Sequence, residues 1–253
     1  MLGKNRISEL QSLHQKKFRI QKNRFFAEGR KTVSELLQQG YPILELYAGE
    51  DFINNHKTLL DKLPVQSIEI SEQELLKISA LKNPDEAFAV CQIPNKTLPE
   101  LHSDETYLFL DSIRDPGNLG SILRLADWFG VKEVIVSDDC VEWTNPKVIQ
   151  ASMGSFMRKQ PYVADSDFWS QLPQNLQLIA ADLQGENLYT DFKGFAGMFI
   201  ISNEANGLSD YLLEKLNKTI HIPSPEPSAE SLNAAMATGV ILGELNRRKF
   251  WNR

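Results

Sequence analysis

The stretch 107-YLFLDSIRDPGNLGSILRLADWFGV-131 decides the fold class, because an apolar strand runs through a short turn directly into a helix. Apolar residues follow at helical spacing from 119 to 129, and the turn before them contains Gly117 and Gly120. A strand followed at once by a helix is the repeating unit of parallel sheets. The turn also lies where a helix N-terminus offers free backbone amides to polar or anionic groups.

The alternation of strand and helix continues downstream of this stretch. Apolar runs predict strands at 133–137, 176–182, 197–202 and 219–223, with helices between them. Parallel strands joined by helical crossovers form sheets that helices cover on both faces. We therefore predict an α/β domain with a parallel sheet in this half of the chain.

Upstream, the pattern indicates a second, smaller α/β domain. Helical patterns at 5–20, 30–39, 52–62 and 72–78 alternate with strand-like runs at 43–49, 65–71 and 87–93. The segment 93-IPNKTLPELHSDE-105 then has two prolines and no periodicity, which is typical of a linker. The sequence thus predicts an N-terminal domain at 1–95, a linker at 96–103 and a second domain at 104–253.

The composition excludes several classes of protein. With 253 residues, of which 42% are hydrophobic, the chain is long enough for proper cores. No apolar run reaches the roughly 20 residues of a membrane-spanning helix, and the start lacks the apolar core of a signal peptide, so we expect a cytoplasmic protein. Cys91 and Cys140 lie far apart and the four histidines have no metal-binding spacing, so we expect neither a disulfide framework nor a bound metal.

Positive charge is concentrated near the N-terminus. Residues 1–31 contain nine lysines and arginines against two glutamates, a net charge of +7, whereas the whole chain carries −6. A local basic surface of this kind favours a polyanionic partner such as RNA. The interleaved phenylalanines at 18, 25 and 26 are compatible with base stacking, but burial in the core is the interpretation we favour for them. The predicted RNA contacts are Lys16, Lys17, Arg19, Lys22 and Arg24.

Three loops are candidates for the chemistry. In an open parallel sheet the ligand binds outside the carboxyl ends of the strands. The loops 115-DPGNLGS-121, 202-SNEANGLS-209 and 223-PSPEPSAESLN-233 each follow an apolar strand and precede a helix. Because all three occur in one predicted domain, we expect them to form one site.

A nucleotide-dependent oxidoreductase is one interpretation of the glycine turn, because Asp138 and Asp139 end the next strand, as in a dinucleotide-binding fold. The turn lacks the G-x-G-x-x-G fingerprint, and it has no Lys-Ser or Lys-Thr pair of a P-loop. The oxidoreductase is kept as an alternative.

Four segments resemble one known family. DPGNLGSILRLADWFGV, IISNEANGLS and IPSPEPSAESLNAAMATGVIL are similar to the three ordered motifs of the SpoU (TrmH-like) RNA ribose 2′-O-methyltransferases of the SPOUT superfamily, and 18-FRIQKNRFFAEGRKTVSELLQQGYPILELYAG-49 is similar to that family's RNA-binding domain. The resemblance implies a C-terminal trefoil knot, an exception to the rule against knots. It also implies S-adenosylmethionine as the cofactor and ribosomal or transfer RNA as the substrate.

The resemblance also implies which residues act. The catalytic positions fall on Asn118, Arg124, Glu204, Ser231 and Asn233. The cofactor-binding positions fall on Leu183, Ser202, Gly207, Ile222 and Leu232, mostly through their backbone. The family assigns Arg124 to activation of the ribose hydroxyl. Because a guanidinium is protonated at any ordinary pH, phosphate anchoring and polarisation of the hydroxyl stay open as its role.

Two positions depart from the family pattern, since Ser202 and Ala205 stand where glycine is usual. An RNA-binding module of the same fold without catalysis is therefore a second alternative. The helix from Leu232 to Leu242 is apolar or small almost all round, which requires cover on more than one side. Burial within its own monomer and burial in a homodimer both satisfy that pattern, and the resemblance favours the homodimer.

Overall fold

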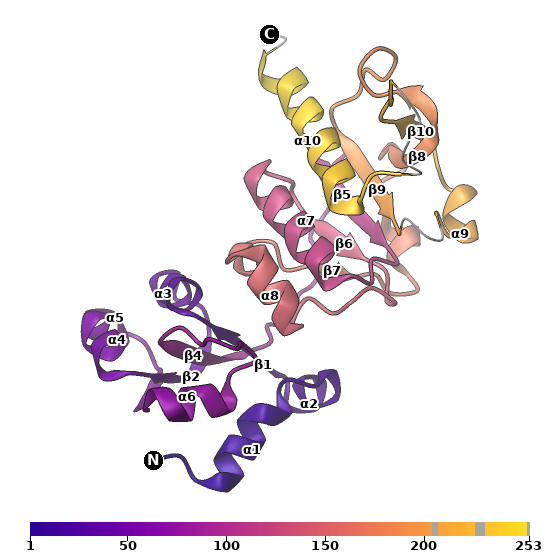
Figure 1. Ribbon diagram of the computed structural model, residues 1–253. Coiled ribbons are helices and arrows are strands. Elements are labelled where there is room, and N and C mark those ends of the chain that lie inside the picture. The colour runs from indigo at the N-terminus through magenta and orange to yellow at the C-terminus, as the bar shows by residue number, and fades with distance from the viewer. Residues whose placement is uncertain (204–206, 226–230, 252–253) are drawn as a thin grey trace. The chain divides into compact units, whose positions relative to one another are not determined.

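The computed structural model describes residues 1–203, 207–225 and 231–251. The chain divides into two compact units, which are described separately below. One unit is Met1–Asn95 together with Thr144–Met157, and the other is Lys96–Trp143 together with Arg158–Arg253. Figure 1 labels the helices and strands of both units.

The first unit is built on a four-stranded sheet within the described residues, in the order β1-β4-β2-β3 (Figure 1). Strand β4 pairs antiparallel with β1 and β2, while β2 and β3 are parallel. The strands are β1 (Arg24–Glu28), β2 (Ile43–Ala48), β3 (Gln66–Glu69) and β4 (Ala87–Gln92). The helices are α1 (Lys4–Ser12), α2 (Lys16–Lys22), α3 (Arg30–Gln38), α4 (Glu50–Asn55), α5 (Lys57–Leu60), α6 (Glu72–Ile78) and α8 (Pro146–Ser152).

The phenylalanines of the basic segment enter the core of this unit. Phe25 and Phe26 are buried on β1, and the ring of Phe26 stacks on Phe88 with centroids 4.7 Å apart. The ring of Phe156, which follows α8, meets Phe25 edge to face at 5.8 Å. Burial of both rings confirms the interpretation of these two residues as core rather than as base-stacking groups.

The N-terminal helix is broken where one continuous helix was predicted over 5–20. Helix α1 ends at Ser12 and α2 begins at Lys16. Between them, the carbonyl oxygen of Leu13 accepts a hydrogen bond from Nη1 of Arg19 at 2.7 Å. Helix periodicity alone cannot reveal this break, because it depends on a side chain that satisfies a backbone carbonyl.

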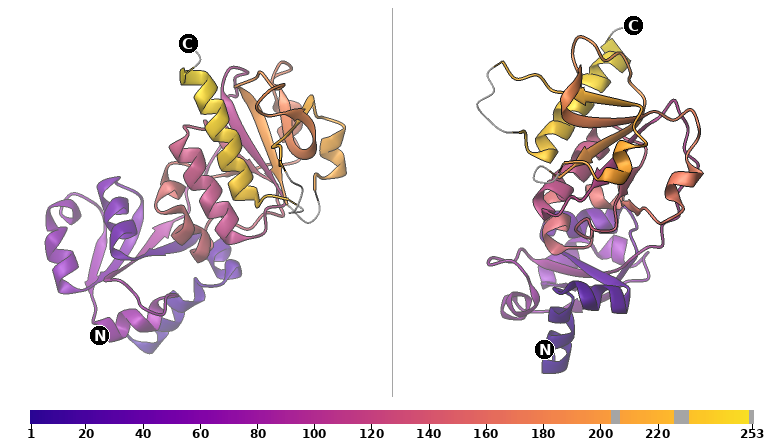
Figure 2. Two further views of the ribbon diagram at one scale, coloured as in Figure 1. Left: turned by 45° about the horizontal axis from the view of Figure 1, so that its top comes forward. Right: turned by 90° about the vertical axis from the view of Figure 1, so that its right-hand side faces the viewer.

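The second unit contains a sheet whose six described strands are all parallel, in the order β10-β8-β9-β5-β6-β7 (Figures 1 and 2). The strands are β5 (Thr106–Asp111), β6 (Val134–Val136), β7 (Tyr162–Val163), β8 (Leu178–Asn187), β9 (Gly197–Ser202) and β10 (Lys218–His221). The helices are α7 (Pro116–Trp128), α9 (Asp210–Leu213) and α10 (Ala234–Trp251), with short 3₁₀ turns at Ser155–Met157 in the first unit and Phe168–Gln171 in this one. The predicted parallel α/β domain is confirmed. Its central strands are buried almost throughout, as expected of parallel strands covered on both faces.

Helix α10 packs along α7 through its small residues. A Cβ atom added at Gly239 would meet the methyl groups of Leu125 at 3.5 Å, and one at Gly243 would meet the ring of Phe129 at 3.9 Å. The glycines therefore let two helices that are distant in sequence approach closely, as Figure 2 shows. One side of the apolar C-terminal helix is thus covered within its own unit.

The C-terminal half of α10 is tied to the chain before β9. Glu244 is buried and accepts hydrogen bonds from Nε of Arg247 and Nε of Arg248, both at 2.8 Å. These guanidinium groups lower the pKa of the Glu244 carboxyl to about 2. Arg248 also donates to backbone carbonyl oxygens of Leu188 and Phe192. The salt bridge thereby fixes the loop at 188–194 to the last helix.

Strands β8 and β10 do not pair continuously. The register passes from Thr219↔Ala180 to Ile220↔Glu186, so residues 181–185 leave the ladder and form an excursion. Gly185 closes this excursion with a φ of +142°, and a Cβ there would stand 2.5 Å from the carbonyl oxygen of Thr219. Only glycine fits that approach, because both the conformation and the space exclude a side chain.

Candidate functional site

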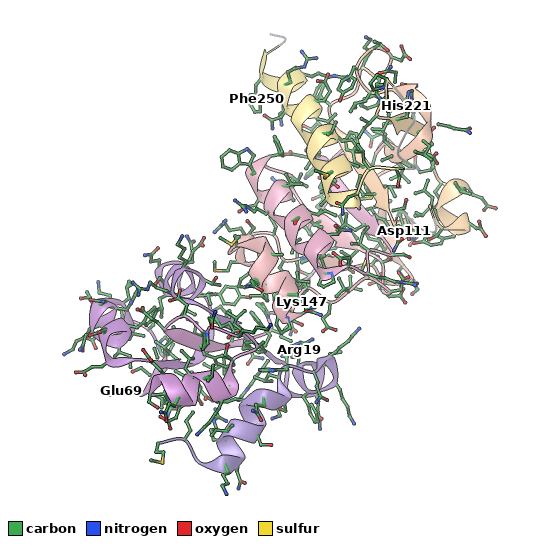
Figure 3. The ribbon with its side chains drawn as sticks, viewed as in Figure 1. Arg19, Glu69, Asp111, Lys147, His221 and Phe250 are labelled. Carbon is green, nitrogen blue, oxygen red and sulfur yellow. The ribbon has the colours of Figure 1, made fainter. Side chains whose placement is uncertain are left out.

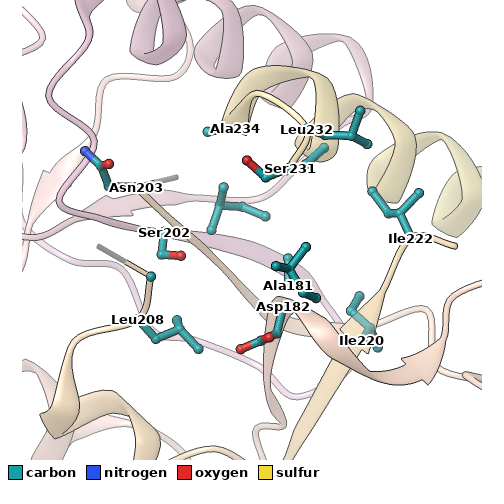
Figure 4. A pocket seen from close by; sticks show the side chains of 14 residues that line it. Ala181, Asp182, Ser202, Asn203, Leu208, Ile220, Ile222, Ser231, Leu232 and Ala234 are labelled. Atoms are coloured by element: carbon teal, nitrogen blue, oxygen red, sulfur yellow. The ribbon is translucent and has the colours of Figure 1, made fainter. Parts of the chain in front are cut away.

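A cavity of about 230 Å³ opens at the carboxyl ends of β8, β9 and β10 (Figure 4). This is the edge of a parallel sheet where ligands bind. Most of the lining is apolar. The described residues that line it are Ala181, Asp182, Leu183, Ile201, Ser202, Asn203, Gly207, Leu208, Ile220, Ile222, Ser231, Leu232, Ala234 and Ala237.

Every residue predicted to bind the cofactor lines this cavity. Ser202 ends β9, and Gly207 lies in the loop that follows it. Ile222 comes directly after β10, Leu232 precedes α10, and Leu183 lies in the excursion of β8. Five positions spread over 50 residues of sequence are thus gathered around one space.

The loop at 115–121 contributes differently, because its first residues build the start of α7. The side chain of Asp115 caps the helix by accepting from the backbone amide of Asn118 at 2.7 Å, and Pro116 occupies the first turn. Neither Asp115 nor Asn118 is among the residues that line the cavity.

Asn118 is nevertheless joined to the cavity by one hydrogen bond. Nδ2 of Asn233 donates to Oδ1 of Asn118 at 2.7 Å, across 115 positions of sequence. Asn233 in turn accepts from the backbone amide of Ala235 at 2.9 Å, which starts α10. Ser231 and Leu232, which precede Asn233, line the cavity. The structure therefore brings three predicted residues together, namely Asn118, Ser231 and Asn233.

Arg124 stands apart from them. It is exposed on α7, is not among the cavity-lining residues, and has no hydrogen bond or ion pair with any described residue. Glu204, the remaining predicted catalytic residue, and Ala205 lie outside the described residues.

Two partly buried polar contacts that the sequence did not indicate hold the loop after β9. Asp111, labelled in Figure 3, is 1% exposed at the end of β5. Its carboxylate accepts from the backbone amide of Ser209 at 2.9 Å and from the Ser209 hydroxyl at 2.7 Å. Nδ2 of Asn203 donates to the carbonyl oxygen of Ser112 at 3.1 Å. Both contacts position a loop that lines the cavity on one side.

Ser112 itself has a left-handed backbone, with a φ of 57°. The strain is held by Asp139, which accepts from the hydroxyls of Ser112 and Ser137, both at 2.7 Å, and pairs with Arg114 at 3.0 Å. These hydrogen bonds lower the pKa of Asp139 against the opposing effect of burial. Asp139, one of the two acidic residues that suggested a dinucleotide-binding fold, therefore supports the turn before α7.

The two cysteines are buried and unpaired with each other. Burial raises the pKa of both thiols, which makes them unreactive. Among the described residues, no group of three or more His, Cys, Asp or Glu side chains is placed to hold a metal ion. None of the described helices is both long and apolar enough to cross a membrane.

The predicted RNA contacts on α2 and β1 differ in their surroundings. Lys16 and Lys17 are exposed. Nζ of Lys22 lies 3.6 Å from the Glu9 carboxylate, and the guanidinium of Arg24 lies 3.8 Å from the Glu45 carboxylate.

Arg19 is only 2% exposed and donates to the backbone of Leu13. This burial argues against Arg19 as an RNA contact. In the sequence Arg19 stands among lysines that are exposed, and nothing in that pattern indicates that its own side chain is buried.

Comparison with known proteins agrees with this geometry. Residues 105–243 match the SpoU rRNA Methylase family, and residues 4–89 match the MRM3-like substrate binding domain. An uncharacterised tRNA/rRNA methyltransferase of Synechocystis is 32% identical over 96% of this chain and 91% of its own length. The 23S rRNA (guanosine(2553)-2′-O)-methyltransferase RlmP of Bacillus subtilis is 26% identical over 95% of each chain.

Solved structures give the same result. A putative RNA methyltransferase of the TrmH family from Porphyromonas gingivalis has a TM-score of 0.83 at 30% identity, covering 98% of this chain and 99% of that one. An AdoMet-bound rRNA methyltransferase from Sinorhizobium meliloti has a TM-score of 0.87 at 28% identity, covering 99% and 97%.

The fold and the cavity thus define an α/β RNA methyltransferase with an appended substrate-binding domain. The chain belongs to the SpoU rRNA methylase family, as its three motifs predicted. It is an S-adenosylmethionine-dependent enzyme that methylates a ribose 2′-hydroxyl of RNA. These matches support neither the oxidoreductase nor the RNA-binding module without catalysis.

Ala237 provides a test of the cavity, because it lines this space from the second turn of α10. Replacing Ala237 by Phe puts a ring into a volume of about 230 Å³, so we expect affinity for S-adenosylmethionine to fall by roughly 100-fold or more. The matched control is Lys249→Phe. Lys249 is exposed on the same helix and does not line the cavity, so the affinity of this variant for S-adenosylmethionine stays within about threefold of wild type. Isothermal titration calorimetry measures both. Equal affinities for the two variants would place the cofactor elsewhere.

Proposed function

We propose that this chain methylates ribosomal RNA, with the cavity as its cofactor site and the Asn118–Asn233 pair beside it as the place where the ribose is held. The observation that carries the proposal is the hydrogen bond between these two asparagines, because it joins the start of α7 to the residue that follows the cavity-lining Ser231 and Leu232. The relatives named for ribosomal RNA support the substrate class.

The cavity suits S-adenosylmethionine. Its apolar side chains, such as Ile201, Ile220 and Ile222, fit a purine, and its polar groups are few, as in most small-molecule sites. When bound there, the cofactor would supply an electrophilic methyl group to the ribose oxygen, with S-adenosylhomocysteine as the leaving group and the hydroxyl proton released to solvent. In this proposal the cofactor is held by Ser202, Gly207, Ile222, Leu232 and Leu183. Ser202 is half-buried, and its side chain does not fill the cavity.

The chain's own residues orient the acceptor hydroxyl. Asn118 and Asn233 fix each other, so the starts of α7 and α10 are held together beside the cavity, where this proposal places the ribose. Ser231 adds a hydroxyl at the cavity wall, and Glu204 belongs to the same proposed group. Arg124 is always charged, so we assign it to anchoring the phosphate and polarising the hydroxyl rather than to accepting a proton.

Arg124→Ala tests this assignment. We expect methyl transfer to ribosomal RNA from cells lacking the protein to fall by about 100-fold, because a charge-positioning group is lost. Affinity for S-adenosylmethionine stays within about threefold, since Arg124 does not line the cavity. Arg124→Lys serves as the control, because it keeps the charge but not the bidentate fork, and we expect it to recover part of the activity. A rate for Arg124→Ala within a few-fold of wild type would refute the role.

We also propose a homodimer in which Arg124 serves the cavity of the partner. Arg124 is exposed and does not line the cavity of its own chain. Two large apolar side chains on the same pair of helices are exposed as well, Trp128 at 83% and Met236 at 65%. Exposed aromatic and methionine side chains of this kind are typical of interface cores.

A complementation experiment tests the shared site. Arg124→Ala and Ala237→Phe are each expected to be inactive, for different reasons. In a mixed dimer, one of the two sites combines an intact cavity with an intact Arg124. Mixing equal amounts after reversible dissociation should therefore restore about a quarter of wild-type activity, by random pairing of the chains. No recovery, with dimers present by light scattering, would show that each chain uses its own arginine.

We propose that residues 1–95 form the RNA substrate-binding domain, 96–103 the linker and 104–253 the methyltransferase domain with its trefoil knot. The two family matches, which end at 89 and begin at 105, support the boundary. We place the protein in the cytoplasm, where its RNA substrate is found.

Charge reversal of Lys16 and Lys17 tests the basic surface. Replacing both exposed lysines by Glu should lower RNA affinity by roughly 10-fold or more at low salt and reduce the slope of log affinity against log salt by about two. The control is the same reversal at Lys57 and Lys62, which are also exposed in this unit but lie around α5. Filter binding over a salt series measures both. If the control loses as much affinity, only the net charge matters.

A further inference from the structure

The excursion of β8 brings a carboxylate to the cofactor cavity. Residues 181–185 leave the β8–β10 ladder, and Ala181, Asp182 and Leu183 line the cavity as a result. In an uninterrupted strand these residues would pair with β10 instead. The irregularity is therefore what delivers Asp182 to the site.

The excursion is held by specific contacts. Gly185 lies against the backbone of Thr219, where no other residue fits. Nδ1 of His221 is 2.9 Å from the carbonyl oxygen of Gly185, and the backbone amide of Gln184 donates to Oδ1 of Asp182 at 3.1 Å. These contacts give Asp182 a defined orientation.

Asp182 is the one charged side chain among the described residues that line the cavity. Its Oδ1 accepts from Gln184, and within the described part of the chain Oδ2 has no hydrogen-bond partner. Figure 4 shows the carboxylate extending from β8 toward the side of the cavity where Ser202 and Leu208 lie. An acceptor oxygen is thus directed to a largely apolar space.

We propose that Asp182 accepts hydrogen bonds from the ribose hydroxyls of the bound S-adenosylmethionine. Ile220 and Ile222 belong to the neighbouring strand and its end, and they are suited to the purine. In this proposal the sugar attached to that purine lies against β8, which stands between β10 and β9 in the sheet. A carboxylate at the carboxyl end of a parallel strand is a known solution for binding a ribose diol. This inference rests on the proposed cofactor site.

The test is a thermodynamic cycle that compares the loss of the Asp182 carboxylate with the loss of each ribose hydroxyl of the ligand. The ligands are S-adenosylhomocysteine and its 2′-deoxy and 3′-deoxy analogues, and the variant is Asp182→Asn. Asparagine keeps Oδ1 for the amide of Gln184, so the excursion is preserved while the second acceptor is lost. The control is Asp138→Asn, since Asp138 is exposed after β6 and does not line the cavity.

We expect wild type and the control to lose about 10- to 100-fold in affinity when a hydroxyl is removed, the usual scale for a hydrogen bond to a charged group. Asp182→Asn should bind S-adenosylhomocysteine about 10- to 100-fold more weakly than wild type and lose no more than about threefold further with the deoxy analogues. Calorimetry or competition binding measures each value.

Three outcomes overturn the proposal. Asp182→Asn binds S-adenosylhomocysteine as wild type does, or it keeps the full loss with the deoxy analogues. Alternatively, 5′-methylthioadenosine, which has the ribose but no ammonium group, binds wild type and Asp182→Asn equally. That result would mean that the carboxylate contacts the amino-acid part of the cofactor instead of the ribose. If wild type binds neither S-adenosylmethionine nor S-adenosylhomocysteine, the proposed cofactor site fails instead.

Discussion

The hydrogen bond from Asn233 to Asn118 is the contact on which the site depends, because it joins the last helix of the chain to the first helix of the catalytic unit. Helix α7 follows β5, and α10 follows Ser231 and Leu232, which line the cavity. The close packing at Gly239 and Gly243 keeps the two helices together behind that bond. The position of α7 relative to α10 and the cavity is thus set by side-chain and backbone contacts between segments more than 100 residues apart in sequence.

Much of this arrangement could be predicted from the sequence, because it depends on local patterns. The apolar run before DPGN and the similar runs later in the chain indicate parallel strands, and the carboxyl ends of such strands lie at one edge. Three loops at one edge are enough to predict a site. The five predicted cofactor positions could be located through the family motifs alone, since contacts predicted to use the backbone leave little trace in residue type.

What could not be predicted depends on register and burial. Asp182 follows the apolar run LIAA and looks like an ordinary strand end, and only the shift between β8 and β10 shows that it reaches the cavity. Arg19 lies in a basic segment whose neighbouring lysines are exposed, yet its own side chain is buried and donates a hydrogen bond to the backbone of Leu13. Asp111 lies in the stretch that decides the fold, but its bond to Ser209 joins positions 98 residues apart. In each case the decisive partner is distant in sequence.

The segment Thr144–Met157 gives the chain an unusual modular organisation. It lies inside the region that matches the methylase family, but it packs with the N-terminal unit, where Phe156 meets Phe25 on β1. The backbone therefore passes between the units three times, and no single cut separates them. If residues 1–95 alone were exchanged for the corresponding domain of a relative, the apolar face of α8, with Val148 and Ile149, would have to pack against different side chains. An exchange of the N-terminal domain that preserves this packing therefore has to include residues 144–157.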